Sequence, residues 1–284
     1  MIYVSTSCVK SKRIGESVRT LADIGFKNIE LSGGTKQYPE FIDELTELKN
    51  TYKLSYLCHN YFPPPDEDFV LNLGSQEDKT FNQAIDLCTK SIKMSEQFGG
   101  TKYAIHAGFF SDINHKEFGH KIGLNKLSER DLCYRKYAEG FDHLRQISSQ
   151  VELYIENNAL SIANKETYGG DGLFMFTHYE SYLELLNYIK FTPLLDVAHL
   201  KVSCNSHGID FSKELKKFFK LTDYVHVSDN DAQYDYGWAL KKDGELTKLL
   251  SELDWSGKTV TLEVYDGLEE LQNSYNIMKE VMEY

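Results

Sequence analysis

The stretch Pro193-Leu194-Leu195-Asp196-Val197-Ala198-His199-Leu200 decides the fold that this sequence predicts. It is a short apolar run that ends at an acid, with a histidine three residues later. Such a run is typical of a strand buried on both faces, as in a parallel sheet. Asp196 would then lie at the carboxyl end of a buried strand, where these sheets carry their chemistry. The structural alternative is an Asp196 that caps the following turn and a His199 that belongs to the core.

Strand and helix signals alternate along the rest of the chain. Apolar runs predict eight strands, at residues 2–7, 28–31, 54–59, 103–106, 151–156, 194–197, 224–227 and 260–264. Amphipathic segments predict a helix after each strand, at residues 14–24, 39–50, 75–98 with Ser75 as N-cap, 129–148, 179–190, 211–221, 246–253 and 268–282. This order predicts a (β/α)8 TIM barrel of the α/β class. The alternative, a doubly wound open sheet, is disfavoured because no glycine-rich dinucleotide loop follows the first strand.

Composition supports one domain over residues 1–284. The 284 residues are 41% hydrophobic, and no linker or low-complexity block divides them. The net charge of −12 comes from interspersed acids and bases, which does not favour a nucleic-acid partner. The five cysteines are an odd number without a C-x-x-C pair, as expected of reduced thiols. With no signal-peptide pattern and no membrane span in the sequence, we expect a cytoplasmic protein that does not contact membranes.

Histidines and acids recur where the predicted strands end. The residues at these positions are His59, His106, Glu156, Asp196, His226 and Glu263. In a barrel these ends meet at one mouth, and three ionised carboxylates would repel one another strongly there. One divalent cation would offset that repulsion, and carboxylate with imidazole suits Mn²⁺, Zn²⁺, Co²⁺ or Fe²⁺. The pattern therefore predicts a metal site at the carboxyl ends of the strands.

Several of these segments resemble known barrels. The run from His59-Asn60-Tyr61 to Ile105-His106-Ala107-Gly108 resembles endonuclease IV. Four other segments resemble the wider xylose isomerase-like barrel superfamily. They are Tyr154-Ile155-Glu156-Asn157-Asn158, Leu195-Asp196-Val197-Ala198-His199, Val225-His226-Val227-Ser228-Asp229-Asn230-Asp231 and Leu262-Glu263-Val264. That superfamily includes sugar and sugar-phosphate isomerases, ketose 3-epimerases and inosose dehydratases.

The resemblance implies roles for individual residues. The metal ligands shared by the epimerases match Glu156, Asp196, His226 and Glu263. His199 matches the residue that holds the terminal oxygen of the substrate. His59 and His106 match positions that hold a further zinc in endonuclease IV and line the sugar site elsewhere.

One departure separates this chain from endonuclease IV. That enzyme carries an Asp-x-His pair after the seventh strand, which helps to hold a third zinc. Here the segment reads Asp235-Tyr236-Gly237, so the second histidine is missing. The resemblance therefore favours a single-metal sugar site over a trinuclear, phosphodiester-cleaving one.

Further residues near the predicted mouth each have two interpretations. Trp238 stacks on a sugar or anchors its own loop. Lys201 pairs with a substrate phosphate or is solvated. Asn158 is a donor to the metal-binding or substrate-binding groups. Glu30 points into the cavity or faces solvent.

Together these observations predict a metal-dependent isomerase or epimerase acting on a small sugar or sugar phosphate. Glu156 and Glu263 would move the substrate proton through a cis-enediolate, and His199 would stabilise the oxygen that gains charge. The alternatives are an endonuclease IV-like zinc phosphodiesterase acting on abasic DNA, an inosose-type dehydratase, and a barrel that binds sugar without catalysis.

Overall fold

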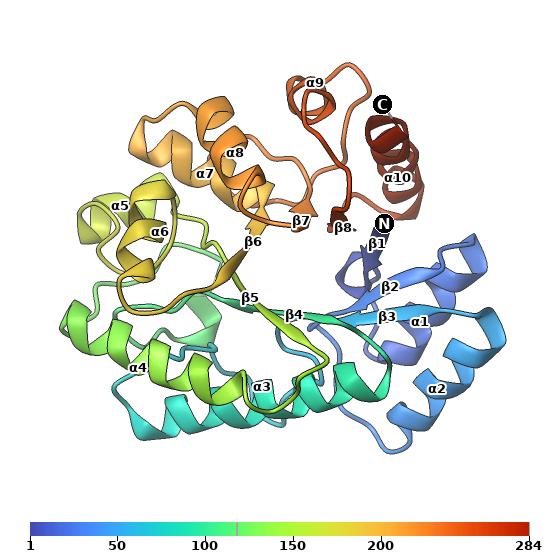
Figure 1. The fold of residues 1–284 in the computed structure, drawn as a ribbon, viewed down its shortest axis with the longest axis horizontal. Coiled ribbons are helices and arrows are strands. Elements are labelled where there is room, and N and C mark those ends of the chain that lie inside the picture. Colours follow the sequence, from blue (N-terminus) through green and yellow to red (C-terminus); the bar gives the residue numbers. More distant parts are fainter. Residues whose placement is uncertain (118, 284) are drawn as a thin grey trace.

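The computed structural model, which describes residues 1–117 and 119–283, is a closed barrel of eight parallel strands in the order β1 to β8 (Figure 1). The strands are β1 (Ile2–Ser5), β2 (Asn28–Leu31), β3 (Ser55–Cys58), β4 (Lys102–His106), β5 (Glu152–Glu156), β6 (Thr192–Asp196), β7 (Tyr224–Val227) and β8 (Thr259–Leu262). Pairing of Val4 in β1 with Leu262 in β8 closes the barrel. The predicted (β/α)8 TIM barrel is confirmed.

Helices surround the barrel on its outside (Figure 1). They are α1 (Ile14–Ile24), α2 (Phe41–Tyr52), α3 (Asp78–Gln97), α4 (Arg130–Leu144), α5 (Ile162–Tyr168), α6 (Tyr179–Leu186), α7 (Val197–His207), α8 (Phe211–Phe219), α9 (Glu245–Ser251) and α10 (Leu268–Glu283). The apolar faces of these helices pack on the outer strand faces to form the main core. None of the described helices is both long enough and apolar enough to cross a bilayer.

Three details differ from the sequence prediction. The structure adds two helices where none was predicted, α5 and also α7, which begins directly after Asp196. The predicted N-cap at Ser75 is wrong, because α3 starts three residues later with Glu77 as its N-cap. The Ser75 hydroxyl instead accepts a hydrogen bond from the Glu77 amide at 3.0 Å, which is a local turn that precedes the helix.

The amino ends of the strands are closed by a packed plug. Tyr154 and Tyr224 fill the barrel interior there, with ring centroids 5.4 Å apart. Lys102 of β4 adds an ion pair of 2.6 Å with Asp223. The plug leaves the carboxyl ends of the strands as the open end of the barrel, where the predicted site lies.

Candidate metal centre

The six strand-end residues converge because parallel pairing places them side by side. His106 of β4 is the register partner of Glu156 of β5, and Asp196 of β6 is the partner of His226 of β7. His59 directly follows β3 and Glu263 directly follows β8. Each side chain thus leaves a buried strand toward the same mouth, as the sequence pattern predicts.

Glu156 lies at the centre of three imidazoles. Its Oε2 atom is 3.1 Å from His59 Nε2 and 3.4 Å from His106 Nδ1, and its Oε1 atom is 3.5 Å from His199 Nδ1. Burial opposes ionisation of this carboxyl, yet the three imidazoles hold the pKa of Glu156 well below its usual range. The site therefore contains a buried, ionised carboxylate that can bind a cation.

Asp196 combines the two roles that its sequence context left open. Its Oδ1 atom accepts a hydrogen bond of 2.7 Å from the His199 amide, which caps α7. Its own amide donates to Asn157 at 2.8 Å. Burial raises the pKa of the Asp196 carboxyl to about 7. The cap thus holds an acid in the interior, where its charge has a high desolvation cost in the absence of a cation.

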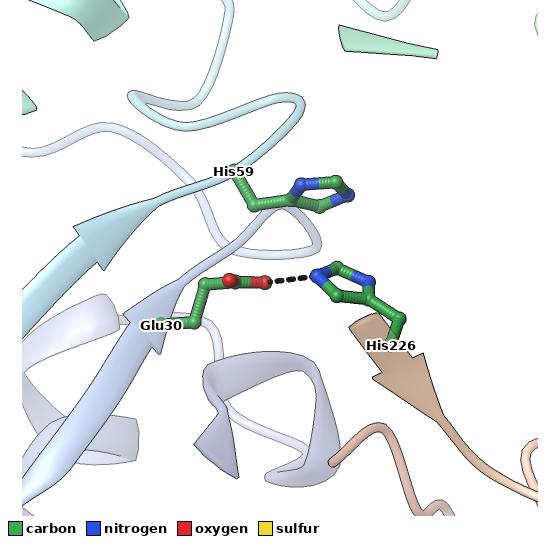
Figure 2. A group of neighbouring side chains, drawn as sticks. All are labelled: Glu30, His59 and His226. Carbon is green, nitrogen blue, oxygen red and sulfur yellow. Dashed lines mark ion pairs between the residues drawn. The ribbon is translucent and has the colours of Figure 1, made fainter. Parts of the chain in front are cut away.

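Figure 2 shows His226 beside Glu30, with the ring of His59 near both. His226 is fully buried, with Nε2 3.1 Å from Glu30 Oε1 and Nδ1 3.5 Å from Glu263 Oε2. Despite burial, the carboxylates of Glu30 and Glu263 raise the pKa of His226 well above its usual value. Glu30 points into the barrel, so the solvent-facing interpretation is wrong.

The four predicted ligands fall into two sets that share Asp196. Potential ligand atoms of Asp196, His226 and Glu263 lie within 4.8 Å of one another, as do those of Glu156, Asp196 and His199. Glu156 Oε1 and His226 Nδ1 are buried without a hydrogen-bond partner in the described residues. Unused carboxylate oxygen and imidazole nitrogen are the donors that Mn²⁺, Zn²⁺, Co²⁺ and Fe²⁺ accept, so these residues fit a divalent ion.

A cavity of about 410 Å³ opens above this set. Its wall includes six of the predicted site residues, which are His59, His106, Glu156, Asn158, His199 and Glu263. The volume is in the lower part of the range for small-molecule sites, which suits a compact ligand.

The remaining predicted substrate contacts lie in different environments. Asn158 lines the cavity, but its amide group donates to the carbonyls of Ala107, Gly108 and Met175 and so holds the loops together. Lys201 is paired with Asp229. Trp238 lies outside the cavity wall and stacks on Tyr236, with centroids 5.3 Å apart.

Two further wall residues lie in the loops after β7 and β8, and only the first belongs to a segment that was singled out from the sequence. Asp235 Oδ2 lies 3.1 Å from His199 Nε2, and Tyr265 lines the cavity beside Glu263. The sequence clue to Asp235 was its place in the Asp235-Tyr236-Gly237 segment. In the structure this acid pairs with His199.

Comparisons with known proteins agree with this architecture. A family model described as xylose isomerase-like TIM barrel matches residues 18–281. A D-tagatose 3-epimerase-like protein is similar in structure, with a TM-score of 0.74, 16% identity and coverage of 99% of this chain and 97% of that one. No curated protein matches the sequence at a significant level.

Two further solved structures illustrate the range of activities on this fold. Escherichia coli 3-keto-D-glucoside 4-epimerase has a TM-score of 0.62 and 13% identity, with 100% of this chain and 99% of that one covered. Endonuclease IV from Thermus thermophilus has a TM-score of 0.62 and 14% identity, with 99% and 98% covered. At these identities the likeness shows the fold.

Proposed function

Since the chain belongs to the xylose isomerase-like TIM barrel family, we propose that it is a metal-dependent isomerase or epimerase of a sugar or sugar phosphate. The observation that carries the proposal is the convergence of Glu156 and Glu263 on one small cavity, directly beside Asp196 and His226. Two carboxylates that face a compact ligand can remove and return a proton. Structural neighbours that act on ketoses and keto-glycosides support the choice of substrate class.

Glu156, Asp196, His226 and Glu263 would hold the ion. The ion, when bound, would polarise a carbonyl and a neighbouring hydroxyl of the substrate and so acidify the C–H bond between them. One of Glu156 and Glu263 would remove that proton and become a carboxylic acid, and the other, after taking up a proton from solvent, would return one to the cis-enediolate. Both carboxyls have pKa values below their usual range despite burial, that of Glu263 at about 2, so both are ionised before substrate binds.

His199 supplies positive charge to the cavity wall. Its Nδ1 atom lies 2.8 Å from the Asn157 carbonyl, and its Nε2 atom lies 3.1 Å from Asp235. Burial opposes protonation, but Asp196 and Asp235 raise the pKa of His199 well above its usual value. A doubly protonated imidazole at this place stabilises an oxygen that gains negative charge.

A second candidate function is the zinc phosphodiesterase. It is favoured by His59, His106 and Glu156, whose potential ligand atoms also lie within 4.8 Å of one another. Against it stands Gly237, which occupies the place of the missing histidine with a left-handed φ of +63°. A Cβ atom there would lie 2.4 Å from the Tyr265 ring and 3.0 Å from the Glu263 carbonyl oxygen. The backbone thus leaves no room for a third-zinc ligand at this position.

The test compares the two chemistries on the same protein. We expect the metal-loaded chain to exchange a substrate C–H proton with D₂O for at least one member of a panel of aldoses, ketoses and their phosphates, followed by NMR. We expect no nicking of abasic duplex DNA with Zn²⁺ supplied. Nicking that requires metal and disappears in His106→Ala would contradict the proposal, and loss of water from a sugar would indicate the dehydratase instead.

The sugar contact predicted for Trp238 stays a prediction, because this residue lies outside the cavity wall. Trp238 is 39% exposed. The other tryptophan, Trp255, is 5% exposed, and its indole N–H donates a hydrogen bond to the Leu250 carbonyl. If Trp238 stacks on the substrate, Trp238→Ala should raise KM by roughly 5–10-fold, since an aromatic contact contributes about 1 kcal/mol, and should leave kcat unchanged. In Trp255→Phe, a control that keeps Trp238, substrate should still quench the fluorescence. An unchanged KM would show that Trp238 only anchors its loop.

A further inference from the structure

We propose that Glu30 is a positioning residue for the metal site, because its carboxylate fixes the orientation and tautomer of His226. The inference rests on the metal dependence in the proposed function. It concerns a residue of β2 that contributes no side chain to the cavity wall and no ligand to the predicted set. Glu30 would act through the imidazole and not on the substrate.

Glu30 is held by three groups at the base of the site. It is fully buried, and its Oε1 atom lies 3.1 Å from His226 Nε2. Its Oε2 atom accepts hydrogen bonds from the Tyr224 hydroxyl and, at 2.9 Å, from the Thr261 hydroxyl. Figure 2 shows the carboxylate directed at the nitrogen edge of His226. The two hydroxyls thus fix one oxygen. The other, Oε1, makes no hydrogen bond within the described residues, and its 3.1 Å contact with His226 Nε2 is an ion pair.

Burial of the Glu30 carboxylate costs desolvation free energy, and no lysine or arginine among the described residues offsets that cost. In the part of the chain that the structure describes, the only ion pair of Glu30 is with His226. No lysine or arginine neutralises it among those residues, although a well-packed apolar side chain would avoid the cost of a buried charge altogether. A carboxylate that costs stability and faces one particular imidazole is better explained by what it does to that imidazole.

The effect follows from the proton count of histidine. A metal ion binds only the neutral imidazole, so the second proton of His226 would leave when the ion binds. A carboxylate at Nε2 then stabilises the tautomer that keeps the remaining proton on that atom. The lone pair then lies on Nδ1, which faces Glu263 at 3.5 Å and belongs to the set formed with Asp196. A carboxylate behind a ligand histidine orients the ring and makes the free nitrogen a stronger donor.

The central variant is Glu30→Gln, which keeps the shape and removes the charge. By titration calorimetry with Mn²⁺ or Zn²⁺ we expect its metal affinity to fall by about 10–100-fold. The matched control is Glu214→Gln in α8, also a buried carboxylate, which accepts a hydrogen bond from the Tyr179 amide at 3.0 Å. That control should bind metal as the wild type does. Equal affinity of Glu30→Gln and wild type would overturn the inference.

Two further measurements separate positioning from a purely structural role. Long-range ¹H–¹⁵N spectra of the zinc-loaded wild type should show His226 protonated at Nε2, and Glu30→Gln should weaken that signature. If Glu30→Gln does not fold, Thr261→Val keeps the charge and removes one hydrogen bond, and it should still lower metal affinity measurably. A Thr261→Val chain with lower thermal stability but wild-type affinity and spectra would show that the network is only structural.

These readouts do not use activity, so the two proposals fail separately. A wild-type chain that binds metal but exchanges no sugar C–H proton would overturn the proposed reaction and leave Glu30 testable. A wild-type chain that binds no divalent metal would overturn both.

Discussion

The substitution Asp196→Asn is expected to abolish metal binding and activity while the barrel stays folded. Asp196 is the one residue shared by the two ligand sets at the base of the cavity. Because the Asp196 charge would directly hold the ion, the loss of metal affinity should be large. It should exceed the loss of about 10–100-fold that is typical when a residue bonded to a metal ligand is removed. Metal content after dialysis, measured by elemental analysis, gives the first readout, and C–H exchange gives the second.

Asparagine is chosen because Asp196 also caps α7. Asparagine and aspartate cap helices about equally well, so Asp196→Asn should keep the cap and lose only the charge. Asp196→Ala is the comparison, and it should lose metal as well as about 1 kcal/mol of the free energy of unfolding that the cap supplies. A wild-type metal content in Asp196→Asn, or loss of its cooperative unfolding, would show that this acid is structural.

The second large effect concerns proton transfer by Glu156 and Glu263. At saturating metal, Glu156→Gln should reduce the overall rate by about 10²–10⁴-fold, because glutamine cannot accept a proton. Glu263→Gln should reduce it similarly. Both side chains line the cavity, and Glu156 is the more deeply buried of the two.

The two variants should differ in which C–H bond they still exchange. If each carboxylate serves one face of the substrate, Glu156→Gln keeps exchange for one of the two interconverting sugars and Glu263→Gln keeps it for the other. Deuterium incorporation by each variant, starting from each sugar separately, is the measurement. Identical incorporation patterns would mean that one base does all the proton transfer.

The strands of this fold could be predicted because their buried faces require short runs rich in apolar residues. Residues 28–31 and 224–227 were predicted to the residue, although each strand carries a buried polar side chain, Glu30 or His226, among its apolar residues. The helix α7 was missed for the opposite reason. Its buried residues include Val197, Leu200 and Val202, which do not form the single stripe of a surface helix.

The candidate site residues at the ends of strands could be predicted from the sequence. Glu30, which lies inside a strand, could not. An acid or histidine at the end of an apolar strand, or one residue before it, predicts Glu156, Asp196 and His226 as candidate site residues without a structure. Glu30 lies inside a four-residue strand, and its neighbours do not show which face of the strand it uses. Its role depends on Thr261 and Tyr224, which are distant in sequence and meet it only in the closed barrel.

The close packing of Gly237 against Tyr265 has a consequence for the evolution of this chain. The Tyr265 amide donates a hydrogen bond of 2.7 Å to the Gly237 carbonyl, so the two loops are locked together at that point. A histidine introduced at position 237 would collide with the tyrosine ring, and a smaller residue at position 265 brings no ligand by itself. A smaller residue at position 265 would also leave the Glu263 carbonyl oxygen and the left-handed φ at position 237 unchanged, and both oppose a side chain there. A change from this sequence to a trinuclear site would therefore require a new backbone course at position 237 as well as new side chains.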